Sequence, residues 1–309
     1  MHLNKPVFWD NPNITIWSIL LFPFSIIYRF IFFIKKIFTI QKNFSAKVIC
    51  VGNIYLGGTG KTPLASRIAN LINKYSKAVV IKKKYENQKN EISFLKKKNN
   101  ILVYPSRVTA LQEAINKKYN YVILDDGLQD NEIKKDVSIV CFSSKQGVGN
   151  GHVLPGGPLR ESLYKLREVD IVVINGKKNN KLERIIKKKN RFIKIFYTSY
   201  VAKNYKKFMK KNFFAFSGIG NNINFLELLK NNNFNIKKYK FFPDHYKYKK
   251  KDILNLKKQA MKYNLQLLTT EKDFLRLNKT ERKNINFLEI ELIIHKEKQL
   301  LKRLLNENN

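Results

Sequence analysis

From residue 46 onward, short apolar runs alternate with segments in which apolar positions recur every three or four residues. The runs are typical of strands buried on both faces, and the recurring positions are typical of helices that pack on one side. This alternation predicts a doubly wound, mostly parallel α/β sheet. We expect strands at 46–53, 77–81, 101–104, 121–126, 137–142 and 171–174, and helices at 61–75 and 107–118.

A strongly basic stretch follows at residues 177–211, and its apolar runs are short, so we interpret it as a connection. A smaller α/β unit is predicted after it, because the alternation of apolar runs and helical periodicity resumes. Its expected elements are strands at 213–220, 265–269 and 287–294 and helices at 224–230, 251–263 and the C-terminus. We therefore divide the chain into an N-terminal hydrophobic anchor (1–45), a core (46–190), a linker (191–211) and a smaller C-terminal α/β domain (212–309).

The N-terminal segment 14–34 is almost wholly apolar and is close to the roughly 20 residues that cross a bilayer as a helix. Pro23 and Arg29 interrupt it. A secretory signal is disfavoured, because no basic region precedes the segment and no small-residue cleavage site follows it. A single span, a helix lying in the membrane interface and a buried helix of the core remain as alternatives. We favour the interfacial helix.

The charge is extreme, with 60 Lys and Arg against 23 Asp and Glu and a net charge of +37. An anionic partner and a compositional drift toward Lys and Asn both explain such a balance. The lysine tracts lack the interleaved aromatic residues that stack on bases, which disfavours nucleic acid and leaves an anionic membrane surface open. The two cysteines, Cys50 and Cys141, give neither metal-ligand spacing nor a disulfide framework, which suits a reducing cytoplasm.

The segment GGTGKT, Gly57 to Thr62, lies between an apolar strand and a predicted helix. Glycines at such a turn let backbone N–H groups surround phosphate oxygens, and the helix N-terminus favours negative charge. Lys61 is expected to reach the terminal phosphates of ATP, and the Thr62 hydroxyl is expected to bind Mg²⁺. The first glycine of the strict phosphate-loop pattern is replaced by Tyr55. The expected ATP-binding residues are Tyr55, Leu56, Gly57, Gly58, Thr59, Gly60, Lys61 and Thr62.

Two acids, Asp125 and Asp126, end the strand expected at 121–126. Ligands of open α/β sheets gather at the carboxyl ends of strands. A carboxylate beside a phosphate-binding loop commonly handles Mg²⁺. We therefore predict that both acids act in catalysis and that Asp125 is a metal ligand.

Six segments resemble one known family in their order and spacing. They are VGNIYLGGTGKTP (51–63), DDGLQ (125–129), GNGHVLPGGPLRE (149–161), AFSGIGN (215–221), FPDHYKY (242–248) and TTEKD (269–273). The family is the tetraacyldisaccharide 4′-kinases of lipid A biosynthesis. The resemblance implies a P-loop enzyme that uses ATP to phosphorylate the 4′-hydroxyl of a lipid disaccharide 1-phosphate, forming lipid IVA. It also implies an N-terminal helix docked at the cytoplasmic face of the bacterial inner membrane. No obligate protein partner is inferred.

The same resemblance suggests further site residues, and it also shows departures. Residues expected to bind substrate or phosphate are Lys83, Arg107, Gln129, Arg160 and Glu161. Lys83 stands where the family has an arginine, and Asp130 stands where it has a histidine.

Asn90 stands at the best match for the family's expected general base, an aspartate, and an amide does not accept a proton at neutral pH. A local misalignment of this Lys- and Asn-rich stretch is the alternative to a true replacement. Glu91 is then a candidate Mg²⁺ ligand or substitute base, and His245, the expected partner of the base, is a candidate to act alone. Asn90 leaves open a degenerate family member with little or no activity. The net charge leaves open a second alternative, a different P-loop NTPase that acts on nucleic acid.

Overall fold

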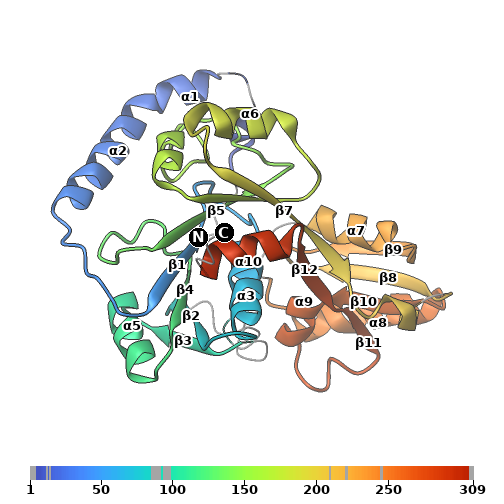
Figure 1. The fold of residues 1–309 in the computed structure, drawn as a ribbon. Coiled ribbons are helices and arrows are strands. Elements are labelled where there is room, and N and C mark those ends of the chain that lie inside the picture. The colour runs from blue at the N-terminus through green and yellow to red at the C-terminus, as the bar shows by residue number, and fades with distance from the viewer. Residues whose placement is uncertain are drawn as a thin grey trace. The chain divides into compact units, whose positions relative to one another are not determined.

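The computed structural model describes residues 5–11, 13, 15–84, 92, 99–208, 210–219, 222–243 and 246–305 (Figure 1). Asn90, Glu91 and His245 lie outside these residues, so their predicted roles stay predictions. The chain forms two compact units. The first comprises Met1–Tyr85, Lys98–Ser199 and Ile294–Asn309, and the second comprises Glu86–Lys97 and Tyr200–Ile293.

The large sheet has the strand order β12-β7-β6-β5-β1-β4-β2-β3 among the described residues. The pairs from β3 to β7 are all parallel, as the continuous apolar runs predict. Register pairs Asp125 with Val51 on one side and with Lys82 on the other, so three strands meet at one carboxyl edge. The strands are β1 (Lys47–Gly52), β2 (Ala78–Lys83), β3 (Ile101–Tyr104), β4 (Tyr121–Asp125), β5 (Val137–Ser143), β6 (Ile171–Asn175), β7 (Lys194–Ala202) and β12 (Ile290–Ile294).

Helices of the first unit pack on this sheet and bury an aliphatic core. The core cluster includes Val48, Val79, Leu111, Val122 and Leu182, all almost fully buried. The helices are α3 (Lys61–Ile72), α5 (Arg107–Asn116), α6 (Asn180–Lys189) and α10 (Glu297–Leu305), with the 3-10 segment η3 (Leu163–Glu168). The C-terminal helix α10 belongs to this unit and not to the smaller one, since Arg67 of α3 donates two hydrogen bonds to Glu297 of α10.

The expected connection at 177–211 instead forms α6, β7 and the 3-10 segment η4 (Tyr205–Phe208). Leu182 and Ile186 are buried one turn apart on α6, while lysines fill its last turn. The sequence did not predict this amphipathic helix, because its many lysines outnumber its few apolar residues. A single apolar stripe is nevertheless enough to bury one face of a helix.

The second unit has a four-stranded parallel sheet in the order β11-β10-β8-β9 among the described residues. Phenylalanines of β8 fill both faces of its core. The single strand expected at 287–294 is instead two strands of different sheets, β11 and β12, separated at Glu289. The elements are β8 (Asn212–Ser217), α7 (Asn222–Asn231), β9 (Asn235–Phe241), α8 (Lys250–Lys262), β10 (Gln266–Thr270), α9 (Glu271–Arg276) and β11 (Ile285–Leu288).

The apolar N-terminal segment folds as two helices, α1 (Ile16–Leu20) and α2 (Phe22–Ile37), after the short η1 (Val7–Trp9). Pro23 lies in the first turn of α2, where its missing N–H costs no helical hydrogen bond. In the described part of the chain, no helix combines the length and apolar character needed to cross a membrane.

Candidate functional site: a phosphate-binding loop and an adjoining pocket

The loop between β1 and α3 is shaped for close approach of a ligand to its backbone. Gly57 and Gly60 have φ values of 139° and 91°, which a side chain would strain. The amide of Asn53 donates to the carbonyls of Tyr55 and Gly57 at 2.6 and 3.2 Å and so holds the turn. Gly60 caps α3 without a side-chain hydrogen bond. The first N–H groups of this helix are therefore available for an anion.

Lys61 and Thr62 begin α3 beside the acids that end β4. The Thr62 hydroxyl lies 2.9 and 3.1 Å from the two carboxylate oxygens of Asp125 and donates to this group. Lys61 Nζ is 3.9 Å from Asp126 Oδ2, a loose ion pair. Asp126 takes a left-handed conformation with φ 58°, and its side chain accepts a hydrogen bond from Arg160 at 2.9 Å. Lys61, Asp125 and Asp126, all predicted to act in catalysis, are thus brought together. The other three predicted catalytic residues, Asn90, Glu91 and His245, lie outside the described residues.

Arg107 is also at this edge, but it contacts the protein backbone. Its guanidinium donates to the carbonyls of Asp125 and Asp126 at 3.2 and 2.7 Å and lies 3.4 Å from Asp130. Arg107 is buried, so it supports the end of β4. Asp130, which departs from the family pattern, supplies its counter-charge.

Tyr55, expected at the ATP site, has its ring beside Gly57 of the loop and its hydroxyl at Asp10 of the N-terminal segment. It is fully buried with Val153 and Leu159, and its hydroxyl donates to Asp10 at 2.8 Å. Burial and the neighbouring Asp10 raise the pKa of this hydroxyl well above its usual value. The side chain therefore connects the loop to the N-terminal segment.

Sequence reasoning missed Lys82. Its Nζ lies 2.9 Å from Asp125 Oδ2, with 8% of the lysine side chain and 0% of the aspartate side chain exposed. The expected strand ended at residue 81, whereas β2 continues through Lys82 to Lys83. The longer strand places Lys82 in the sheet beside Asp125, while Lys83, predicted to bind phosphate, is its last, partly buried residue.

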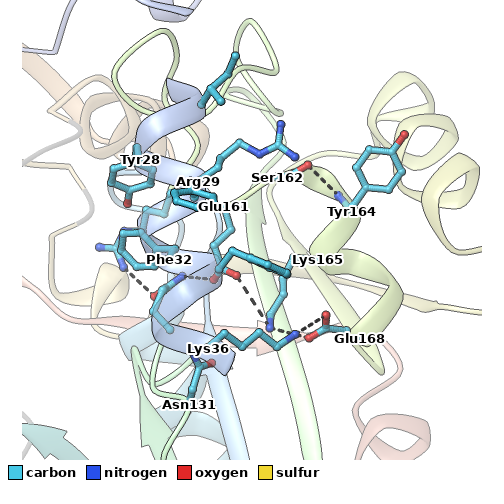
Figure 2. Close-up of a pocket in the computed structure, with 15 residues that line it drawn as sticks. Tyr28, Arg29, Phe32, Lys36, Asn131, Glu161, Ser162, Tyr164, Lys165 and Glu168 are labelled. Carbon is cyan, nitrogen blue, oxygen red and sulfur yellow. Dashed lines mark hydrogen bonds and ion pairs between the residues drawn. The ribbon is translucent and has the colours of Figure 1, made fainter. Parts of the chain in front are cut away.

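A pocket of about 500 Å³ lies between α2 and residues of the segments 129–131 and 160–168 (Figure 2). One wall is α2, which contributes Ile26, Phe30 and Phe33, and the other is polar. On the polar wall, the side-chain amide of Gln129 donates to Glu161 at 2.9 Å, and Arg160 lies 3.4 Å from the side-chain oxygen Oε1 of Gln129. The remaining lining residues are Tyr28, Arg29, Phe32, Lys36, Asn131, Ser162, Tyr164, Lys165 and Glu168.

Ion pairs close one end of this pocket. Glu168 accepts hydrogen bonds from Lys36 of α2 and from Lys165, each at 2.8 Å. Burial raises the pKa of Glu168, but the bonds to Lys165 and Lys36 outweigh it and leave that pKa below its ordinary value. Arg160 lines the pocket and also bonds Asp126, which lies 3.9 Å from Lys61, so one side chain links the pocket to the acids beside the phosphate-binding loop.

The residues present fit a magnesium ion held jointly with a nucleotide. Thr62 and Asp125 offer a hydroxyl and a carboxylate side by side, which are ligands that Mg²⁺ prefers. The structure shows no group of three or more acidic, histidine or cysteine side chains able to hold a metal within the described ranges. Mg²⁺ commonly uses one or two carboxylates and completes its shell with phosphates and water, so such a group is not required.

Strand β1 of the parallel sheet leads through a glycine loop into a helix that begins with Lys61 and Thr62, and an acid at the end of β4 lies beside them. This arrangement defines a nucleotide-binding protein of the P-loop class. Sequence similarity narrows this class. The model of the tetraacyldisaccharide-1-P 4′-kinase family matches residues 17–309. The chain belongs to this family.

Individual relatives agree with this assignment. A tetraacyldisaccharide 4′-kinase from Pelagibacter ubique is 43% identical over 318 residues, covering 100% of both chains. The corresponding protein of Rickettsia bellii is 34% identical and covers 88% of this chain and 89% of its own. The crystal structure of LpxK from Aquifex aeolicus in complex with ATP has a TM-score of 0.70 at 24% identity, covering 94% of this chain and 98% of that one. This last likeness supports the α/β fold.

Proposed function

We propose that this protein transfers the γ-phosphate of ATP to the 4′-hydroxyl of tetraacyldisaccharide 1-phosphate, giving lipid IVA in lipid A biosynthesis. Family membership supports the reaction. The observation that carries the proposal is the position of Arg160, which lines a pocket with one apolar and one polar wall and bonds Asp126 beside the phosphate-binding loop. A kinase for a lipid-linked sugar needs this juxtaposition.

The described residues include groups that can bind and neutralise the negative charge of the ATP phosphates. The loop N–H groups and Lys61 would bind the β- and γ-phosphates, and Lys61 is free to turn toward them because its contact with Asp126 is loose. Thr62 and Asp125 would hold Mg²⁺, which when bound supplies neutralisation of phosphate charge. Arg160 would place its guanidinium between the transferred phosphate and the sugar. Phosphoryl transfer depends chiefly on such positioning and neutralisation.

We propose that the pocket takes the sugar head of the substrate against Gln129, Arg160 and Glu161. Carbonyl, carboxylate and guanidinium groups there match hydroxyls and phosphate, while Ile26, Phe30 and Phe33 offer an apolar wall to acyl chains. Gln129 is already fixed by its bonds to Glu161 and to the Asn53 carbonyl at 3.2 Å, so it is preorganised for a ligand.

We propose that α1 and α2 lie in the cytoplasmic surface of the bacterial inner membrane. Their polarity is inverted for a helix in water, because Ser18 and Ser25 are buried while Ile27 and Ile31 are 56% and 59% exposed. Ser25 accepts from the Gly156 N–H at 3.1 Å and donates to the Val153 carbonyl at 2.9 Å, which fixes the serine face inward. An apolar face presented outward is typical of an interfacial helix, and lysines in the last turn suit anionic headgroups.

The reaction is tested with purified full-length protein, ATP labelled in the γ-phosphate and lipid disaccharide 1-phosphate. Labelled lipid product is expected, and product no greater than that of a Lys61→Ala variant would contradict the proposal. Added DNA or RNA is expected to leave the rate unchanged, because no described feature selects nucleic acid.

The general base is proposed to be Glu91 or His245, since Asn90 cannot take a proton. The slow or inactive alternative rests on Asn90 alone. Asn90→Asp separates the two: a gain in kcat of about 10²-fold, the scale of general-base catalysis, would support a missing base, and an unchanged kcat would support a substitute.

Membrane attachment is tested by vesicle sedimentation of an Ile27→Ser/Ile31→Ser double variant. Each lost side chain is worth roughly 1.5 kcal/mol or more of apolar burial, so binding should weaken by at least about a hundredfold. Ile223→Ser, which removes an isoleucine that is 62% exposed on α7, is the matched control and should bind like the unchanged protein. Equal binding by the double variant would contradict attachment through this face.

A further inference from the structure

Lys82 is a buried charge that the reaction described above does not use, although its ion-pair partner Asp125 takes part in it. The two residues are register partners on the neighbouring strands β2 and β4, which lie side by side next to α3 in Figure 1. Their charged atoms are 2.9 Å apart, with 8% and 0% of the side chains exposed. The strand backbone fixes where the lysine stem begins, so the ammonium is held at this carboxylate.

Lys82 and Thr62 use the same carboxylate oxygen. Oδ2 of Asp125 accepts from Lys82 Nζ at 2.9 Å and from the Thr62 hydroxyl at 2.9 Å. This is the carboxylate that fits Mg²⁺. A positive charge is therefore already in contact with the group to which a divalent cation would bind.

The second acid at this edge is also neutralised by cations. Asp126 accepts a hydrogen bond from Arg160 at 2.9 Å and lies 3.9 Å from Lys61. With both carboxylates paired, a free divalent cation meets little net negative charge and is repelled by the nearby ammonium. A triphosphate reverses this balance, because its negative charges attract the metal and the lysines together.

We propose that Lys82 is a positioning residue that makes divalent metal binding at Asp125 conditional on the triphosphate. It holds the carboxylate against Thr62 and offsets its charge, so that metal and nucleotide bind as one unit. Lys82 thus sets the coupling between the two ligands. This inference rests on the proposed nucleotide-dependent function of the same site.

The test measures binding of Mn²⁺, a spectroscopic substitute for Mg²⁺, to the full-length protein by electron paramagnetic resonance. Each protein is titrated with and without a non-hydrolysable ATP analogue. Lys82→Gln keeps a hydrogen-bond donor for Asp125 but removes the charge, and Lys82→Arg keeps the charge. Lys117→Gln is the matched control, because Lys117 pairs with Glu113 at 3.0 Å in an exposed ion pair.

In the unchanged protein, Mn²⁺ should bind weakly alone and tightly with the analogue. Lys82→Gln should bind Mn²⁺ alone about tenfold more tightly, and the ratio between the two conditions should shrink by a similar factor. Lys82→Arg should restore the ratio, and Lys117→Gln should leave it unchanged. Because coupling is reciprocal, the affinity for the analogue measured with and without metal must change by the same factor.

An unchanged ratio in Lys82→Gln would overturn the inference, as would a failure of Lys82→Arg to restore it. If the glutamine variant does not fold, the unchanged protein still decides: Mn²⁺ binding that is equally tight without the analogue overturns the inference. An unchanged protein that binds neither analogue nor metal–analogue complex would instead refute the proposed function, and the inference with it.

Discussion

The carboxyl edges of the two parallel sheets carry the same kinds of side chain but differ in how those side chains are satisfied. At the large sheet, glycines with positive φ form an open loop, and Lys61 holds Asp126 only loosely at 3.9 Å. At the small sheet, Asp273 accepts from the Gly218 N–H at 3.0 Å, from Thr270 at 2.7 Å and from Arg276 at 2.8 Å.

The difference identifies the carboxyl edge of the large sheet as a binding edge and that of the small sheet as a structural edge. The buried hydroxyl oxygen of Thr59 has no hydrogen-bond partner among the described residues. At the small sheet, Thr270 caps α9, and Asp273 joins the ends of β8 and β10 through its bonds to Gly218 and Thr270. Parallel topology alone therefore does not make a site. A site also needs a backbone that leaves its N–H groups free and charges that can change partners.

The largest expected effect is at the binding edge. Lys61→Ala should lower kcat by about 10³-fold, because a preorganised cation at the transferred phosphate is lost. Phosphate transfer to the lipid disaccharide measures this, with Lys117→Ala as a control that should keep full activity. A loss of less than tenfold in Lys61→Ala would contradict the distinction between the edges.

A smaller effect, on stability, is expected at the structural edge. Asp273→Asn should lower the local unfolding free energy of the second unit by about 3 kcal/mol, since Arg276 would lose its buried counter-charge. Amide hydrogen exchange should accelerate in β8 and β10 while β1 and β4 stay protected. Equal acceleration in both sheets would mean that Asp273 does not act locally.

The smallest effect is expected for an exposed ion pair, that of Glu168 and Lys36, which serves as a comparison for the buried hydrogen bonds of Asp273. Glu168 and Lys36 are each 51% exposed, so Glu168→Gln should destabilise α2 by less than about 1 kcal/mol. The pKa of Glu168 lies below its ordinary 4.5, so its contribution is present above that pH and is lost as pH falls through the lowered value. Amide exchange in α2, compared between the two proteins at each pH, should differ at neutral pH and converge in acid. A difference that persists in acid would exclude ionisation as its cause.

Local pattern was enough to predict most of the large sheet and the centre of the site. The parallel strands, the glycine loop with Lys61 and Thr62, and the acids at the end of β4 all follow from short-range sequence. These features can be predicted because apolar runs, glycine turns and helix starts depend on residues a few positions apart. The roles of Asn90, Glu91 and His245 stay predictions.

Tertiary structure alone decided which side chains are paired and which faces are buried. Lys82 reads as one lysine of a basic tract, yet strand register sets it against Asp125, 43 residues away along the chain. Arg107 was expected to bind substrate or phosphate, and the fold buries it against two backbone carbonyls. Ser25 turns inward while Ile27 faces out, because the loop at Gly156 supplies the serine's partners. The sequence by itself determined most strands of the large sheet and the chemistry of the loop. Which side chains are paired and which are buried was decided by the tertiary structure, because both depend on contacts between residues that are distant in the chain.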